Sequence, residues 1–169
     1  MLRQSGAAWP PAYATRWTQC SNSSNTKALT SVHLTADGSR VLVTFAHVVS
    51  GTTNVVAAEA CAFQANDGAP LWCTLPYPTA GGSITPTVAA VSADGQLVWH
   101  HATAGLLVVD AMAAGTPQIR LLYSGGASDC CSATALAISQ DVVVASIPDG
   151  TLDPPWCHCQ HSKLLAVKL

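Results

Sequence analysis

The sequence predicts an all-β fold built from repeated units of four short strands, and three observations support this prediction. Apolar stretches that end in an Asp-Gly pair recur at Leu34–Gly38 and Val91–Gly95. Each is followed by an apolar strand, a turn of small residues and a short strand with an aromatic side chain, at Ala60–Trp72 and Leu106–Tyr123. No window carries a helical apolar period long enough for a convincing helix. Recurrence after about 50 residues is typical of repeat proteins, in which one unit cannot bury its apolar face alone.

The composition indicates one domain with little surface charge. Of the 169 residues, 49% are hydrophobic and 9% are charged, whereas charged residues make up about 25% of a typical soluble domain. The net charge is −2 and the seven Lys and Arg residues are scattered, so we expect no surface for nucleic acid or for an acidic membrane.

No run of about 18 apolar residues could span a membrane, and the N-terminus lacks the apolar core of a signal peptide. Seven cysteines cannot all pair within one chain, so the compartment stays open.

Each strand is expected where an apolar run lies between turn signals. Asp-Gly pairs at Asp37–Gly38, Asp67–Gly68 and Asp94–Gly95 are hairpin signals, because Gly tolerates the positive φ that tight turns need. The predicted strands are Ala28–Leu34, Arg40–His47, Val55–Gln64 and Pro70–Leu75 in the first unit; Pro86–Val91, Gln96–His101, Leu106–Ala111 and Gln118–Tyr123 in the second; and Ala133–Ser139, Val142–Ser146 and Lys163–Leu169 in the third.

The third unit lacks a fourth strand, and a single strand near the N-terminus is its counterpart. Residues 1–13 are expected to form an extension, followed by a strand at 14–19 with Trp17 where the later fourth strands carry Trp72 and Tyr123. The units then span 28–75, 86–123 and 133–169, so the chain is a circularly shifted array. The three aromatic rings are expected to fill the space between neighbouring units, with ligand stacking as the alternative.

Four-stranded units of this length are typical of β-propeller blades, and one segment resembles a particular propeller family. Ala62–Trp72, which contains Asn-Asp-Gly, is similar to the repeat motif of the quinoprotein-like family, also called pyrroloquinoline-quinone-like repeats. Asp110 and Gly115 match the same motif, while Tyr123 replaces its Trp and Leu164–Leu169 resembles its strand alone. The resemblance covers residues 14–169. It implies a partial propeller of about three four-stranded antiparallel blades.

Two other propeller families fit the sequence less well. Blades of the WD-repeat family require a Gly-His and a Trp-Asp pair, which are absent. Kelch blades are a closer rival because glycine doublets recur at Gly81–Gly82 and Gly125–Gly126. Both doublets fall before the first strand of a unit, however, where we expect loops between blades.

The adjacent pair Cys130–Cys131 could close a disulfide ring. Catalytic quinoproteins resemble this chain in having such a ring above the quinone, and they hold Ca²⁺ with Asp, Glu and Asn beside it. Here the acidic residue next to the pair is Asp129 alone, and Glu59 is the one Glu in the chain, whereas Ca²⁺ takes six to eight oxygen ligands. We therefore expect no cofactor, with pyrroloquinoline quinone and calcium as the alternative.

A second cysteine cluster and a histidine pair also invite a chemical interpretation. Cys157, Cys159 and His161 share one face of an extended segment and are ligands suited to Zn²⁺ or Cu⁺. The usual two-residue spacing between the cysteines is missing and a fourth ligand must come from elsewhere, so a cysteine-rich loop is the preferred interpretation. His100 and His101 end a strand, with one ring on each side of the sheet, and no nucleophile motif accompanies them.

The sequence therefore predicts a non-catalytic quinoprotein-like propeller segment that acts as a binding or scaffold module. No serine-hydrolase elbow, phosphate loop or pair of catalytic carboxylates is present. Its expected partners are a protein or peptide, and the remaining blades of a larger propeller or a second copy of the chain. The first alternative is a fragment of a quinone-dependent dehydrogenase that uses Cys130 and Cys131. The second is a small metal-handling protein that uses Cys157, Cys159 and His161.

Overall fold

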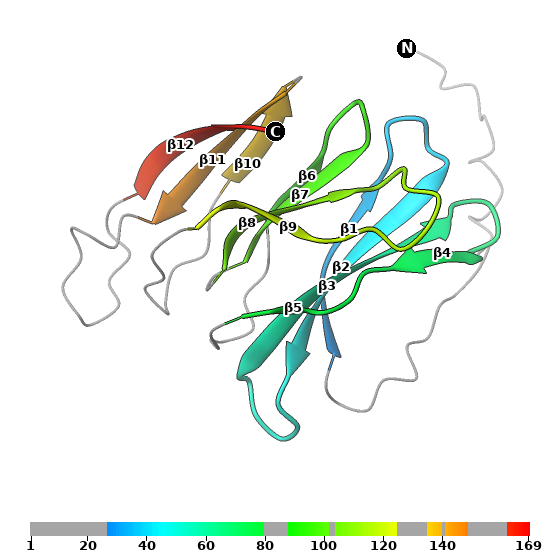
Figure 1. Cartoon of the computed structure of the whole chain (residues 1–169), viewed down its shortest axis with the longest axis horizontal. Helices are drawn as coiled ribbons and strands as arrows, with labels where there is room; N and C mark the ends of the chain where they lie inside the picture. The colour runs from blue at the N-terminus through cyan, green and yellow to red at the C-terminus, as the bar shows by residue number, and fades with distance from the viewer. Residues whose placement is uncertain (1–26, 80–87, 102–103, 125–134, 140, 149–161) are drawn as a thin grey trace, which may run out of the picture.

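The fold is all-β, and its strands form three antiparallel sheets that follow one another along the chain (Figure 1). The structure is a computed structural model that describes residues 27–79, 88–101, 104–124, 135–139, 141–148 and 162–169. Every regular element in this part of the chain is a strand. The predicted fold class is thus confirmed at the level of antiparallel β-sheets.

Sheet one contains four strands in chain order and a fifth, very short strand. The four are β1 (Lys27–Leu34), β2 (Arg40–Val48), β3 (Val55–Gln64) and β4 (Pro70–Cys73). The additional strand, β5 (Tyr77–Pro78), pairs with β3 at Ala57 and Ala58, on the same edge as β4. Val, Phe and Thr dominate β2, residue types that suit a pleated surface with one or both faces buried.

Sheets two and three repeat this meander, in which each strand pairs with its neighbour in the sequence. Sheet two contains β6 (Ala89–Val91), β7 (Gln96–His101), β8 (Gly105–Asp110) and β9 (Arg120–Tyr123), paired in that order. Sheet three contains β10 (Ala135–Ser139), β11 (Val142–Pro148) and β12 (Ser162–Lys168). Each predicted strand that begins and ends within the described residues overlaps one of these strands. Only β5, two residues long, was not predicted.

The turn between the first two strands has the same hydrogen bonds in sheets one and two. Thr35 N donates to Arg40 O at 3.1 Å, and Ser92 N donates to Gln96 O at 2.9 Å. In each turn the hydroxyl of the first residue donates to the Asp carboxylate. The Gly after that Asp has a positive φ, 68° in the first turn and 87° in the second, which glycine adopts without steric cost. The sequence repeat is therefore also a repeat of local structure.

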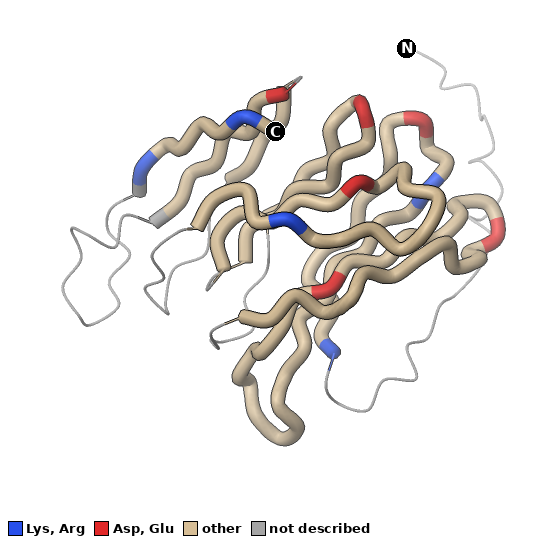
Figure 2. The backbone as a smooth tube through the Cα atoms, viewed as in Figure 1, with Lys and Arg blue, Asp and Glu red and all other residues tan. Residues whose placement is uncertain are grey.

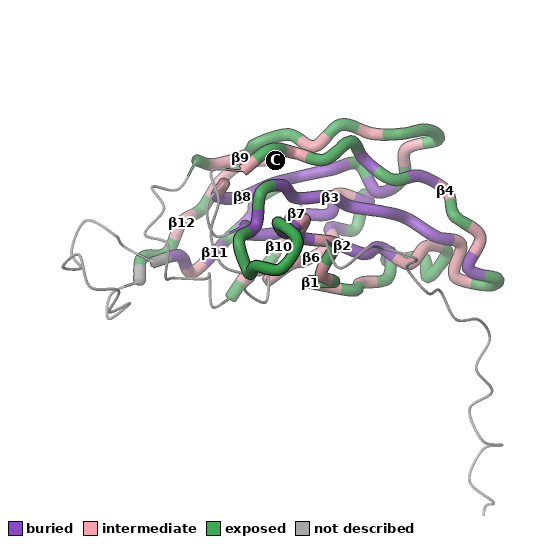
Figure 3. Tube along the Cα trace, turned by 90° about the horizontal axis from the view of Figure 1, so that it is seen from below, coloured by how far each residue is buried: buried purple, intermediate pink, exposed green. Residues whose placement is uncertain are grey.

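The sheets stack face to face, with an apolar core in each of the two spaces between them (Figure 3). The core between sheets one and two contains the large rings of Trp72 and Trp99 and small residues that leave room for them, namely Ala58, Ala60, Ala62 and Ala111. The core between sheets two and three contains Val98, Leu106, Val108, Val143, Ala145 and Ile147. Sheet two is thus buried on both faces, which explains the nearly continuous apolar sequence of β7 and β8.

Two of the three aromatic residues that the sequence analysis places on fourth strands lie in the part of the chain that the structure describes, and both contact an apolar core. Trp72 is 5% exposed in the core between sheets one and two. Tyr123 is half-buried and packs against the core between sheets two and three. The predicted strand at 14–19 with Trp17, and the extension 1–13, lie outside the described residues.

Backbone contacts between the sheets are most extensive at the first strands. Among described strands of different sheets, these are the contacts of β6 with β1 and of β6 with β10. At the start of β2, next to the turn from β1, Arg40 reaches across and donates from Nη1 to the carbonyl oxygens of Ala111 and Ala113, at 2.8 and 3.0 Å. The sheets are therefore joined by contacts between first strands, by the apolar cores and by this side chain.

Each outermost sheet has one face that no described sheet covers, and we call these the two end faces. The first end face is the side of sheet one that points away from sheet two, and its β1 residues Leu29, Val32 and Leu34 are 54–60% exposed. The last end face is the corresponding side of sheet three, with exposed Ala135, Ala137, Val142, Val144, Leu164 and Ala166. Both end faces are mainly apolar.

Candidate functional site

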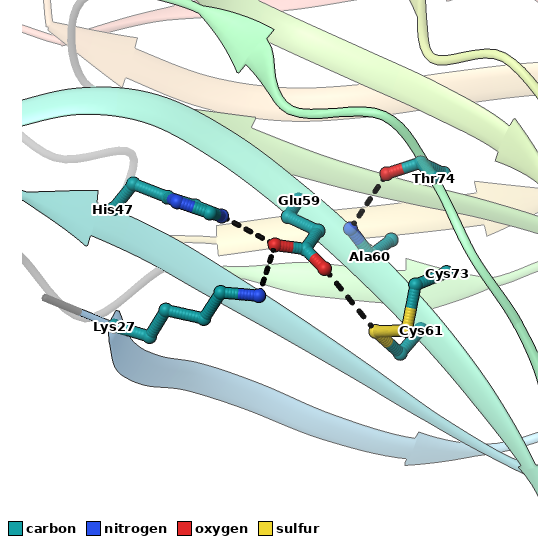
Figure 4. A network of polar contacts seen from close by, with 7 residues as sticks. All are labelled: Lys27, His47, Glu59, Ala60, Cys61, Cys73 and Thr74. Carbon is teal, nitrogen blue, oxygen red and sulfur yellow. Dashed lines mark hydrogen bonds and ion pairs between the residues drawn. A yellow bond between two sulfur atoms is a disulfide. The ribbon is translucent and has the colours of Figure 1, made fainter. Parts of the chain in front are cut away.

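A buried carboxylate, that of Glu59 on β3, organises a polar cluster on the first end face (Figure 4). The Glu59 side chain is only 5% exposed. Lys27 Nζ on β1 lies 2.8 Å from Glu59 Oε2, and His47 Nε2 on β2 makes a short contact with the same oxygen. A buried carboxylate requires such partners, because an unpaired buried charge is strongly destabilising.

Strand register brings these three side chains together. Lys27 lies opposite His47 in the β1–β2 pair, and His47 lies opposite Ala57 in the β2–β3 pair. Glu59 follows Ala57 by two residues, so it projects from the same face and is a diagonal neighbour of His47. The Lys27 ammonium also lies 5.9 Å from the centre of the Phe45 ring, within the range of a cation–π contact.

A disulfide between Cys61 and Cys73 lies beside this carboxylate. The two cysteines are directly opposite each other in the β3–β4 pair. Thr74 holds the end of β4 against β3, because its N–H donates to Ala60 O at 2.8 Å and its Oγ1 accepts from Ala60 N at 3.1 Å. The two sulfurs differ in environment, since Cys61 is 3% exposed and Cys73 belongs to the exposed residues.

The Glu59 carboxylate connects this disulfide to the imidazole of His47. Its Oε1 atom lies 3.6 Å from Cys61 Sγ, while its Oε2 atom contacts Lys27 and His47. In the disulfide the sulfur has no proton to donate, whereas in a dithiol the Cys61 S–H would point at a carboxylate that can accept it. The arrangement is therefore suited to the removal of a proton from the buried Cys61 thiol by the Glu59 carboxylate, whose other oxygen contacts His47, a residue with a side chain that is 20% exposed.

The same residues also form a potential set of metal ligands. A carboxylate oxygen of Glu59 and the sulfurs of Cys61 and Cys73 lie within 4.8 Å of one another, and thiolate and carboxylate are both zinc ligands. Sulfurs joined in a disulfide cannot coordinate as thiolates. Metal binding by this group would therefore require the dithiol form and would compete with the disulfide.

Charged residues are sparse elsewhere along the described backbone (Figure 2). The described Lys and Arg residues lie on separate strands or at opposite ends of one strand, at Lys27, Arg40, Arg120, Lys163 and Lys168. Four Asp residues occupy turns or the ends of strands, and their carboxylates accept hydrogen bonds from the turn, at Asp37, Asp67, Asp94 and Asp110. Bonds from the Thr35 hydroxyl and from Ser39 lower the pKa of the Asp37 carboxyl to about 2. These residues thus have the turn role that the sequence predicts.

The two glycines of the predicted motif that follow β3 and β8 have different roles. Gly68 has a φ of 74° in the β3–β4 turn, as an Asp-Gly hairpin requires. Gly115 lies in the irregular segment between β8 and β9, where a Cβ atom would meet no other atom within 4 Å. Gly68 is therefore required by the backbone conformation, whereas the surroundings of Gly115 leave space for a side chain.

His100 and His101 are both buried at the end of β7, each 6% exposed. As predicted, the alternation of the strand places them on opposite faces of sheet two, because the preceding residues Val98 and Trp99 belong to different cores. Burial, with a smaller contribution from His101, lowers the pKa of His100 to about 4, and burial also lowers the pKa of His101. Both rings are therefore neutral at pH 7, and no nucleophile motif adjoins them.

The remaining predicted site residues lie outside the part of the chain that the structure describes. They are the pair Cys130 and Cys131 and the cluster Cys157, Cys159 and His161. Neither the quinone alternative nor the metal alternative of the sequence analysis is tested by the geometry.

The polar cluster around Glu59 was not predicted, although one signal for the disulfide is present in the sequence. Cys61 and Cys73 each lie six residues from Asp67, the centre of a predicted hairpin turn. Residues equidistant from a tight turn lie opposite each other in a hairpin, so this pairing could have been found. The contacts of Lys27 and His47 with Glu59 depend on the register of three strands and have no comparable local signal.

The comparisons with known proteins add no relative to these observations. Searches of protein-family models, curated proteins and solved structures find no match for this chain. Among the described residues, no helix has the length and apolar character needed to cross a bilayer.

Proposed function

We propose that this chain is a three-unit segment of a quinoprotein-like β-propeller and that it acts as a binding or scaffold module without catalysis of its own. One observation carries the proposal: the most extensive backbone contacts between described strands of different sheets are those of β6 with β1 and of β6 with β10. Propeller blades are arranged radially, so their first strands converge around a central axis. Convergence of the first strands is what such an arrangement requires.

The repetition of local structure supports the same proposal. Each sheet is a meander in chain order, and the turn between the first two strands has equivalent hydrogen bonds at Thr35 and Ser92. The sequence motif that resembles the quinoprotein-like repeat falls on the third and fourth strands of sheets one and two. Units of this kind stack on one another to bury a continuous apolar core.

The two end faces indicate what the module binds. Sheet two is buried on both sides by its neighbours, whereas sheets one and three each have an apolar face with exposed side chains such as Leu29, Val32 and Val144. We propose that further blades cover these faces, supplied by the rest of a larger propeller or by a second copy of this chain. Ring closure by two copies would give six blades.

Substitution of a single residue on the last end face tests this proposal. Val144 is 40% exposed on β11, so Val144→Glu places a charge on the proposed interface without disturbing a core. The matched control is Leu121→Glu, because Leu121 is 43% exposed on β9, at the edge of sheet two. Light scattering after size-exclusion chromatography should show that the wild-type chain self-associates, that Val144→Glu weakens association at least about tenfold and that Leu121→Glu does not.

A well-folded wild-type monomer at concentrations of about 100 µM would contradict the proposed binding role of the end faces. Equal effects of the two substitutions would show that association uses another surface. A shortened chain that lacks residues 1–20 adds a further test, since the N-terminal strand expected at 14–19 should contribute to closure. Its loss should weaken association if the strand pairs with β12, either within one chain or between two chains.

The enzymatic alternative is tested separately. Pyrroloquinoline quinone and Ca²⁺ are added to the purified chain, and reduction of an electron-accepting dye by alcohols or sugars is followed. The proposal predicts no dye reduction above the rate without protein. Quinone-dependent reduction that disappears in a Cys130→Ser variant would instead support a dehydrogenase.

A further inference from the structure

We propose that Cys61 and Cys73 form a reversible dithiol–disulfide pair that exchanges with external thiols and disulfides, with Glu59 as the proton acceptor for Cys61. The pair lies on the first end face, so the proposal concerns the chain with that face uncovered, because a further blade there would lie over the pair. The proposal rests on the unequal exposure of the two sulfurs and on the carboxylate that links the buried sulfur to His47.

The difference in exposure assigns separate roles to the two cysteines. Cys73 is an exposed residue on the edge strand β4 and is disulfide-bonded to Cys61, so it is the member of the pair that an external thiolate or disulfide can approach. Cys61 is 3% exposed on the central strand β3, and an external reagent cannot approach it directly. Cys73 is therefore the sulfur that forms the mixed disulfide, and Cys61 is the sulfur that resolves it.

The oxidation of the dithiol proceeds in two displacement steps. The Cys73 thiolate attacks an external disulfide, forms a mixed disulfide and releases one external thiolate, which takes a proton from water. Cys61 then attacks Cys73 Sγ, the new S–S bond forms and the second external thiolate leaves. In total two cysteine thiols lose two electrons and two protons, and one external disulfide becomes two thiols.

The second step requires the loss of a proton from a buried thiol, and Glu59 is placed to accept it. Its Oε1 atom is 3.6 Å from Cys61 Sγ. Its Oε2 atom contacts His47, whose side chain is more exposed than that of Glu59, at 20% against 5%. Glu59 can thus take the proton from the sulfur at Oε1 and release it to the departing external thiolate or to water once the new S–S bond has formed. The ammonium of Lys27, 2.8 Å from Oε2, balances the charge of the carboxylate in this buried position.

The charged and titratable groups beside this pair come from three strands. They are Lys27 on β1, His47 on β2 and Glu59 on β3. Glu59 is the one carboxylate among them. Replacement of Glu59 by the isosteric Gln therefore removes the proton acceptor and leaves both sulfurs in place.

The sequence allows the pair to be followed in the full chain although five other cysteines are present. Cleavage by trypsin after Arg40 and Arg120 releases one peptide, residues 41–120, in which Cys61 and Cys73 are the only cysteines. Further cleavage before Asp67 separates the two. Mass spectrometry after acid quench and alkylation can thus distinguish dithiol, disulfide and a mixed disulfide on either cysteine.

The experiment starts from the chain reduced with dithiothreitol in the presence of EDTA and then adds excess oxidised glutathione. In the wild type, glutathione should appear transiently on Cys73 and then be lost as the disulfide forms. In Glu59→Gln the first step should be unchanged, while the second should slow by about 100-fold, the usual contribution of a general base. The glutathione adduct on Cys73 should therefore accumulate. Asp141→Asn is the matched control, since Asp141 pairs with Lys168 at 3.4 Å on the surface far from the disulfide.

Three results would overturn the proposal. The first is glutathione attached to Cys61, and the second is resolution of the mixed disulfide at the wild-type rate in folded Glu59→Gln. The third is a disulfide that dithiothreitol reduces only after the chain unfolds, as monitored by circular dichroism, which would make the bond purely structural. The wild-type chain alone decides the first and the third, so the test remains valid if Glu59→Gln does not fold. His47→Gln should slow the second step less than Glu59→Gln, because the carboxylate remains.

Discussion

The side chain of Arg40 on sheet one makes hydrogen bonds to the backbone of the segment that follows sheet-two strand β8. Its Nη1 donates to two carbonyl oxygens of the turn that follows β8, those of Ala111 and Ala113. Hydrogen bonds from a charged donor contribute about 1.5–3 kcal/mol when partly buried. Arg40→Met, which keeps the aliphatic stem, should therefore lower the free energy of unfolding by about 1–3 kcal/mol. Urea denaturation measures this change.

The control for Arg40 is a second arginine that is exposed. Arg120→Met on β9 should change the free energy of unfolding by less than about 0.5 kcal/mol. Equal losses in the two variants would show that Arg40 does not hold the sheets together.

The buried histidines predict a pH dependence of stability. The pKa of His100 is about 4 in the folded chain, against about 6.5 in an unfolded one. Between these values the unfolded chain binds more protons, so stability is complete above pH 6.5 and falls as the pH approaches 4. Protonation of His100 lowers the free energy of unfolding by on the order of 3 kcal/mol. The lowered pKa of His101 adds to this loss of stability.

Urea denaturation at pH 7 and pH 4.5 tests this expectation. His100→Gln should remove the part of the difference between the two pH values that comes from His100, because the amide does not titrate, while the part from His101 remains. Asp37 affects stability at lower pH. Because its pKa is about 2, its contribution to stability is lost only as the pH falls below about 4. A variant whose stability still falls as steeply as that of the wild type would contradict the assignment to His100.

At the scale of a strand, Trp72 on β4 should contribute more to the stability of the packed sheets than Tyr123 on β9. It is 5% exposed between sheets one and two, and deletion of a large buried ring costs about 3–5 kcal/mol. Trp72→Ala should therefore cost much more than Tyr123→Ala, because Tyr123 is only half-buried. Trp72→Phe should cost less than Trp72→Ala, since the indole N–H has no acceptor among the described residues. Thermal unfolding measures the stability of all three variants. Equal shifts in melting temperature for Trp72→Ala and Tyr123→Ala would contradict the packing described for β4.

A second prediction at the scale of an element concerns the stability cost of replacing the glycine in the turn between β6 and β7. Gly95 has a φ of 87°, and a Cβ atom there would lie 2.3 Å from Met112 Cγ. Gly38 in the equivalent turn has a φ of 68° and no atom within 4 Å of such a Cβ. Gly38→Ala should cost about 1 kcal/mol from the backbone alone, and Gly95→Ala should cost more. Combination with Met112→Ala should reduce the cost of Gly95→Ala to that of Gly38→Ala, and a double-mutant cycle without coupling would contradict the contact.

The strands could be predicted from the sequence because each begins and ends at local signals. Asp-Gly pairs such as Asp94–Gly95 mark the turns, and apolar runs between them have the length of strands. The sequence is less informative about register, that is, which residues of the third and fourth strands lie opposite each other. Trp72 lies opposite Ala62, two residues from Gln64, the partner of Arg40 beside the first turn. Tyr123 lies opposite Leu106, four residues from Asp110, the partner of the equivalent Gln96. A β-bulge in each pair shifts the register, and bulges have no clear signal in the sequence.

The candidate site could be predicted only in part. The symmetric placement of Cys61 and Cys73 about Asp67 indicates their pairing, since it depends on a single hairpin. The environment of Glu59 depends instead on β1 and β2. A charged residue in an otherwise apolar strand shows that partners are needed, but local sequence does not specify which ones.

At the scale of the whole molecule, the proposed function depends on how the sheets are arranged around one another. A stack of parallel layers would keep neighbouring sheets equally close at all strands. A radial arrangement brings first strands together and leaves later strands further apart. The contacts of β6 with both β1 and β10 are those that the proposed radial arrangement requires, and apolar end faces are what we expect of blades that have further neighbours.

Nuclear Overhauser spectroscopy of methyl groups tests this arrangement most directly, and a chain of 17.4 kDa is small enough for it. The radial arrangement predicts contacts from Ala89 and Val91 on β6 to the core between sheets one and two, and from Val88 to the core that includes Leu136 and Ile138 on β10. It also predicts weaker or no contacts between β4 and β9. Contacts of β6 with only one of its two neighbours, or contacts between β4 and β9 as strong as those between first strands, would contradict the radial arrangement.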